Sequence, residues 1–189
     1  MSSETPIPPK SVFVKLSILS GNTVQVAGLA AAGVLLSIAR SATSKPAAIA
    51  TMLAAWVLLY FFCHGIAHWA VGRLLGISFA YYTIGGTGNP GGYPRGLRWI
   101  FEHLPFFGVR TEKDSIRKAR PVAKAIMWSA GVASSAAIPT LGALYAWRAA
   151  VPGSKLLLIF ALFWSIGTLS SNWRSQTGDF SKARRSLGC

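Results

Sequence analysis

The chain has 189 residues, of which 52% are hydrophobic and only 13% are charged, whereas a soluble domain usually carries about 25% charged residues. Nineteen Lys and Arg residues against five acids give a net charge of +14, and the basic residues lie between and beyond the apolar stretches rather than on one face. This pattern argues against a nucleic-acid-binding protein and favours an integral membrane protein whose charge meets an anionic cytoplasmic leaflet.

Four mainly apolar stretches are long enough to cross a bilayer. We expect them to form transmembrane helices over about residues 23–40, 47–71, 122–147 and 155–173. The predicted fold class is therefore an all-α polytopic membrane protein with about four transmembrane helices. Residues 1–22 are expected to form an N-terminal tail, residues 23–173 the membrane domain, and residues 174–189 a basic C-terminal tail.

The distribution of basic residues predicts the orientation of these helices. Fifteen of the 19 Lys and Arg residues lie in the two tails and in residues 72–124, which comprise the long connection after the second stretch and the first residues of the third. The other four, Arg40, Lys45, Arg148 and Lys155, lie in or directly beside the two remaining connections. Both termini are therefore expected to be cytoplasmic.

The long connection, residues 72–121, has two parts. The segment "ISFAYYTIGGTGNPGGYP" combines aromatic and β-branched residues with a cluster of Gly, Asn and Pro, which predicts a strand and a turn at the membrane surface. The segment "RGLRWIFEHLPFFGVR" is aromatic and basic, which predicts an interfacial amphipathic segment. A short β-rich surface segment is thus expected after the second helix.

Two histidines stand out in "FFCHGIAHWAVGRLLGI", residues 61–77. His64 and His68 are four residues apart, so on a helix they share one face, as two zinc ligands from a single helix do. Ionisable side chains are costly inside a bilayer and therefore suggest a functional site. The alternative is that both imidazoles only form hydrogen bonds to neighbouring helices.

A tetrahedral metal site needs a further ligand from elsewhere in the chain. Asp179 lies a few residues beyond the fourth helix, on the predicted cytoplasmic side where the histidine helix also ends, so the two can meet. Cys63 points about 100° away from His64 around the helix and is a poor co-ligand. His103 is another possible ligand, although it is expected to be solvated at the surface.

The segment "HGIAHWAVGRLLGISFAYYTIGGTGNP" resembles the opening signature of the site-2-protease-like intramembrane zinc metalloproteases. In that family H-E-x-x-H closes a transmembrane helix, and an aspartate preceded by an asparagine, near the end of a later helix, completes the zinc site. The segment "NWRSQTGDFSKARR" is a weaker match to this second motif, with Asn172 and Asp179 in those roles. The resemblance thus implies a zinc site of His64, His68 and Asp179.

Gly65 stands where this family carries its glutamate, which acts as the general base. Glycine cannot accept a proton, so the resemblance implies a non-proteolytic homologue that binds a metal or a membrane-protein partner. One alternative is an active intramembrane protease in which another acid, such as Glu102, replaces the missing base. A second alternative is a metal-free structural subunit of a membrane complex.

Overall fold

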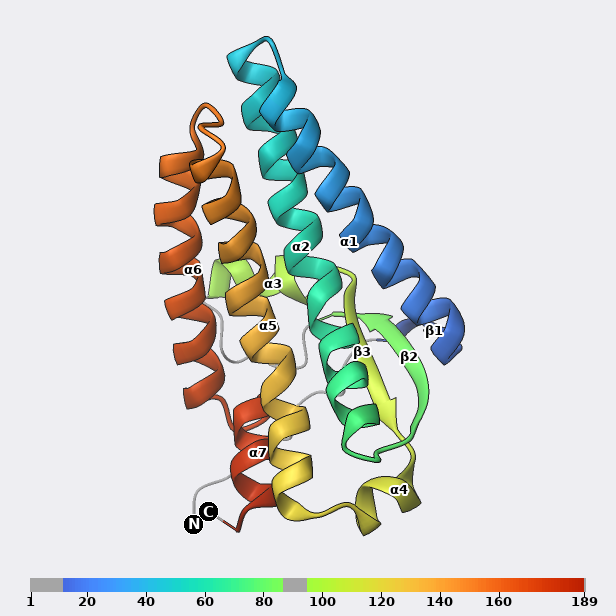
Figure 1. Cartoon of the computed structure of the whole chain (residues 1–189). Helices are drawn as coiled ribbons and strands as arrows, with labels where there is room; N and C mark the ends of the chain where they lie inside the picture. The colour runs from blue at the N-terminus through green and yellow to red at the C-terminus, as the bar shows by residue number, and fades with distance from the viewer. Residues whose placement is uncertain (1–11, 87–94, 189) are drawn as a thin grey trace.

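The computed structural model describes residues 12–86 and 95–188, which fold into a bundle of long helices with a small sheet at one end (Figure 1). The predicted Gly- and Pro-rich turn lies largely outside the described residues, as does the first half of the predicted N-terminal tail. The helices are α1 (Ile18–Ser41), α2 (Lys45–Leu74), α3 (Arg95–His103), α4 (Lys113–Lys118), α5 (Pro121–Arg148), α6 (Ser154–Arg174) and α7 (Asp179–Ser186). The strands are β1 (Val12–Leu16), β2 (Phe79–Gly85) and β3 (Phe106–Thr111).

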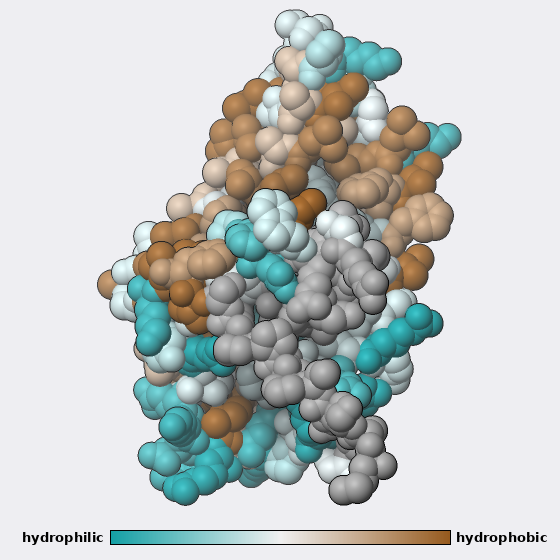
Figure 2. Space-filling model, turned by 180° about the vertical axis from the view of Figure 1, so that it is seen from behind, coloured by the Kyte–Doolittle hydropathy of each residue, from teal (hydrophilic) through white to brown (hydrophobic). Residues whose placement is uncertain are grey.

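Three of the described helices, α1, α2 and α6, are long and apolar enough to cross a membrane. Helix α5 has 28 residues, but small and polar residues and the internal Pro139 interrupt its apolar stretch. Hydrophobic residues gather over the part of the surface formed by the long helices, and hydrophilic residues gather at the end that carries α4 and α7 (Figure 2). The chain is therefore a mostly helical protein with the surface of a membrane protein.

Local sequence signals explain where helix α2 begins and ends. Ser44 caps its N-terminus by accepting a hydrogen bond from the backbone N–H of Ala47, and Pro46 occupies the first turn, where its missing N–H is not needed. Gly76, just after the helix, adopts a φ of +77°, which a residue with a side chain rarely takes. This reversal leads the chain directly from the histidine helix into strand β2.

The three strands form an antiparallel sheet in the order β1–β2–β3. In the central strand β2, Tyr82 pairs with Leu16 of β1 on one side and with Val109 of β3 on the other. Strand β3 lies in the segment for which we expected a single interfacial element; the structure divides that segment into α3 and β3. Strand β1 lies within the residues expected to form the tail, so the sheet is larger than the sequence indicated.

Two apolar clusters hold the fold together. One lies between the long helices and consists largely of small residues, among them Ala32, Ala55 and Ala143. The other joins the sheet to α5 and includes Tyr82 and Met127. Helix α5 contacts α2, α6 and α7, so it brings the histidine helix and the C-terminal helix together.

Candidate metal centre

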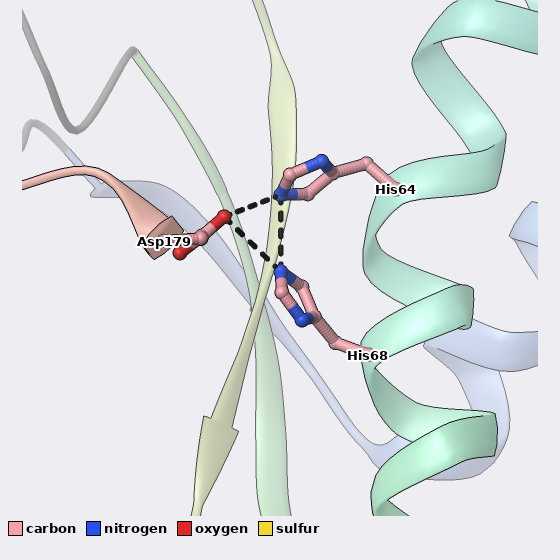
Figure 3. Close-up of side chains that lie close together, drawn as sticks. All are labelled: His64, His68 and Asp179. Atoms are coloured by element: carbon pink, nitrogen blue, oxygen red, sulfur yellow. Dashed lines mark hydrogen bonds and ion pairs between the residues drawn. The ribbon is translucent and has the colours of Figure 1, made fainter. Parts of the chain in front are cut away.

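The side chains of His64, His68 and Asp179 converge on one point (Figure 3). The Nε2 atoms of both histidines lie 3.2 Å from Asp179 Oδ2, and they lie 3.2 Å from each other. One ligand atom from each residue falls within 4.8 Å of the others, so this group could hold a metal ion. The structure thus brings together the three residues that the sequence singled out.

Two elements that are distant in the chain supply these side chains. His64 and His68 project from adjacent turns of α2, as their spacing predicted. Asp179 is the first residue of α7, which packs against α5. Helix α5 therefore serves as the scaffold against which both halves of the site are placed.

The other ring nitrogen of each histidine is held by a residue of α5. His68 Nδ1 lies 2.7 Å from the backbone carbonyl oxygen of Met127, and His64 Nδ1 lies 3.0 Å from Ser135 Oγ. Histidines that bind metals usually have such a partner on the second nitrogen, which fixes the ring and its tautomer. Both rings are thus oriented with Nε2 toward the common point.

The contact with Met127 determines the tautomer of the neutral His68 ring. A carbonyl oxygen can only accept a hydrogen bond, so Nδ1 must donate, and in the neutral ring Nε2 then carries a lone pair. That lone pair faces His64 Nε2 and the carboxylate of Asp179 at 3.2 Å. A metal ion at the common point would accept these electron pairs; without a metal, a proton on His64 Nε2 can bridge to them while Ser135 Oγ donates to His64 Nδ1.

Asp179 is held from both sides. Lys182 Nζ donates to Asp179 Oδ1 at 2.8 Å, and the backbone N–H of Asp179 donates to Asn172 Oδ1 at 3.3 Å. Burial alone would raise the pKa of the Asp179 carboxyl, but the charges and hydrogen bonds of His68, His64 and Lys182 hold it well below its ordinary value. The carboxylate is therefore ionised, with Oδ2 left to face the histidines.

A glycine on α5 makes room for the histidine ring. A Cβ atom built on Gly131 would overlap the imidazole of His68, with Nε2 as the nearest atom. His68 has only 3% of its surface exposed, so the ring has no free space into which to move. Gly131 is thus part of the site, although it carries no donor atom.

The three side chains open onto a cleft of about 1120 Å³. One wall consists of residues from β2 and β3, and the opposite wall comes from α5, α6 and α7, including Ser135, Asn172 and Lys182. A ligand that enters the cleft can therefore reach the point where the three donor atoms meet.

The other candidates from the sequence do not join this group. Among the described residues, the ligand group contains no cysteine, and the buried Cys63 places its Sγ near the carbonyl oxygen of Tyr60. His103, on α3, is exposed and bonds through Nδ1 to the carbonyl oxygen of Trp99. Glu102, also on α3, is not one of the described residues that line the cleft.

No protein family, curated protein or solved structure matches the chain. The resemblance of the histidine segment to site-2-protease-like metalloproteases therefore stays a prediction based on that segment and on the residues around Asp179. The geometry of the described residues is independent of that resemblance.

Proposed function

We propose that this chain is an integral membrane protein that holds zinc with His64, His68 and Asp179, and that it is a non-proteolytic homologue of the site-2-protease-like metalloproteases. The observation that carries the proposal is the convergence of two imidazole nitrogens and one carboxylate oxygen. This donor set is one that zinc accepts in sites that leave a position for a further ligand. A zinc ion held there would act as a Lewis acid toward an oxygen ligand.

The proposed loss of proteolysis follows from Gly65. This residue has no side chain to take up a proton, and Asp179 is the only acid within the ligand group of the described residues. Glu112 and Asp114 line the cleft, but both are exposed, and Asp114 forms an ion pair with Arg117 at 3.3 Å. We infer that the site binds a membrane partner or the metal itself rather than cleaving peptides.

The proposed topology has four transmembrane helices, with α5 as the fourth, and both tails in the cytoplasm. Figure 1 supports it by placing the sheet, α4 and α7 at one end of the bundle and the α1–α2 and α5–α6 connections at the other. The basic residues of α4 and α7 lie at the first end, as expected for a cytoplasmic face. The metal site then lies toward the cytoplasmic side.

Elemental analysis of the detergent-purified protein tests the proposal. We expect about one zinc ion per chain. His64→Ala, His68→Ala and Asp179→Ala should each lose it, and the matched control His103→Ala should retain it. A wild-type protein that remains free of divalent metal after dialysis against zinc would show that the cluster is a set of ion pairs only.

A protease assay separates the proposal from the active-enzyme alternative. The wild type and Glu102→Gln are incubated with a membrane-embedded test substrate. We expect no hydrolysis by either protein. Zinc-dependent hydrolysis by the wild type that Glu102→Gln abolishes would establish the alternative.

A further inference from the structure

Lys182 places a positive charge beside the candidate metal centre. Its ammonium group lies 2.8 Å from Asp179 Oδ1 and 4.6 Å from the centroid of the Trp128 ring. The carboxylate and the aromatic face both attract the cation and restrict where it can lie. Because 37% of the side chain remains exposed and it lines the cleft, Lys182 is accessible to a ligand there.

The charges that line the cleft balance one another before any metal is added. The described lining contains three basic residues and three acids: Arg110, Lys113 and Lys182, and Glu112, Asp114 and Asp179. The histidines are neutral when they bind a metal. A dication therefore leaves two positive charges in excess.

The excess is centred on the metal. Lys182 already offsets the charge of Asp179, which is the only acid in the ligand group of the described residues. Glycine at position 65 adds no second carboxylate. An anion next to the metal and Lys182 thus gains electrostatic energy that an uncharged amide carbonyl does not gain.

We propose that the loaded centre binds an oxyanion, a carboxylate or a phosphate group, between the metal and Lys182. This inference rests on the proposed metal site and names the class of ligand that the site selects. Both cations are common partners of carboxylate and phosphate oxygens. Ser135 and Asn172 on the same cleft add polar side chains to the wall. A neutral peptide bond is the disfavoured ligand.

Cobalt(II) provides a direct test, because its visible absorption changes when its ligands change. The metal-free protein is loaded with cobalt and titrated at constant ionic strength with acetate, inorganic phosphate or acetamide. We expect acetate, phosphate or both to produce a saturable spectral change, whereas acetamide, the neutral analogue of acetate, produces none. The anion that binds distinguishes a carboxylate ligand from a phosphate ligand.

Three variants test the part played by Lys182. Lys182→Gln keeps a donor for Asp179 but removes the charge, and it should weaken anion binding roughly tenfold while cobalt still binds. Lys182→Arg should retain most of the affinity. Lys118→Gln removes an exposed positive charge on α4, outside the described lining of the cleft, and should have no effect.

The outcomes separate this inference from the metal site itself. If the wild type does not bind cobalt or zinc, both proposals are wrong. If cobalt binds but neither anion changes its spectrum, or acetamide changes it equally, the metal site stands and the oxyanion site is overturned. Unchanged anion affinity in Lys182→Gln also overturns it. The comparison of acetate with acetamide needs only the wild type. It therefore tests whether the centre prefers an anion to a neutral amide even if the variants do not fold.

Discussion

Gly65 lies against the side-chain amide of Gln25 on α1, so closely that a Cβ atom at position 65 would stand 2.7 Å from Gln25 Oε1. The same Cβ would lie 3.3 Å from side-chain atoms of Phe107 and Tyr82. Gln25 is fully buried. A side chain at position 65 would therefore crowd Gln25 and the sheet, which favours a glycine between the two histidines.

Substitution of Gly65 by glutamate should consequently destabilise the protein. We expect Gly65→Glu to cost about 1–3 kcal/mol through overpacking, measured as a lower thermal midpoint in detergent. Adding Gln25→Ala should recover part of this loss, because it removes the nearest obstructing atoms. Equal midpoints for the single and double variants would show that Gln25 is not the obstacle.

The Gly65→Glu variants also test for a dormant protease. A dormant protease would gain zinc-dependent hydrolysis of a membrane-embedded substrate in Gly65→Glu or in its combination with Gln25→Ala. The wild type should show no such hydrolysis. Activity in the wild type would contradict the proposed loss of proteolysis. Stable, metal-loaded variants without activity would show that a carboxylate at position 65 does not suffice.

Metal retention should also depend on Gly131. A methyl group there would overlap the His68 ring, so Gly131→Ala should displace a ligand and lower metal affinity at least tenfold. Gly167→Ala on α6 is the matched control, because a Cβ at that position meets nothing within 4 Å. Metal titration of the two purified variants gives the comparison. Full retention by Gly131→Ala would mean that α5 moves away without disturbing the site.

The hydroxyl of Ser135 should strengthen metal binding by orienting His64. Ser135→Ala removes the partner of His64 Nδ1 and should weaken metal binding roughly 10- to 100-fold. The neighbouring Ser134 bonds instead to the backbone carbonyl oxygens of Cys63 and Gly131, so Ser134→Ala should leave the affinity nearly unchanged. Competition with a chelator of known affinity measures both. Similar losses from both serines would point to a general effect on helix packing.

The ionised Asp179 predicts a pH dependence of stability in the metal-free protein. Its pKa lies well below its ordinary value of about 3.9. The stabilisation is therefore fully present at neutral pH and is lost as the pH falls below about 4, by up to about 1.4 kcal/mol per pH unit. The difference in unfolding free energy between the wild type and Asp179→Asn should shrink in that range. A difference that stays constant to pH 3 would contradict the depressed pKa.

The proposed topology predicts the location of a C-terminal reporter. A reporter fused after Cys189 should be cytoplasmic, because 15 of the 19 basic residues lie in the segments assigned to that side. A second fusion in the α1–α2 connection, between Ser41 and Lys45, should report from the opposite side. Reporters on the same side of the membrane would rule out the four-span topology, because in it three spans, α2, α5 and α6, separate the two fusion points.

The long elements were predictable because their signals are local. Each of the four apolar stretches lies within one long helix, and the His64–His68 spacing fixes a shared face once a helix forms. Strand β2 was predicted from its aromatic and β-branched residues. Asp179 was placed near the histidines by topology and resemblance, without any information on its hydrogen bonds.

The rest of the site depends on contacts between distant segments. No local pattern distinguishes Ser135, which holds His64, from Ser134 beside it. Lys182 looked like one of many basic residues in a tail, and its ion pair exists only because α7 docks on α5. Gly131 is visible in the sequence only as a glycine inside a long helix. The reason for it is the His68 ring, which comes from α2. Strand β1 shows no signal of burial, since most of it is exposed.

The separation of the ligands along the chain has a consequence for biosynthesis. His68 and Asp179 are 111 residues apart, and α5 and α6 lie between them in the sequence. The nascent chain therefore exposes both histidines while the last two long helices are still being made. The aspartate arrives only after these helices have been synthesised and α7 can dock. A chain whose translation stops before α7 carries two imidazoles without their carboxylate, so under the proposed metal site only the finished chain presents all three ligands to the metal.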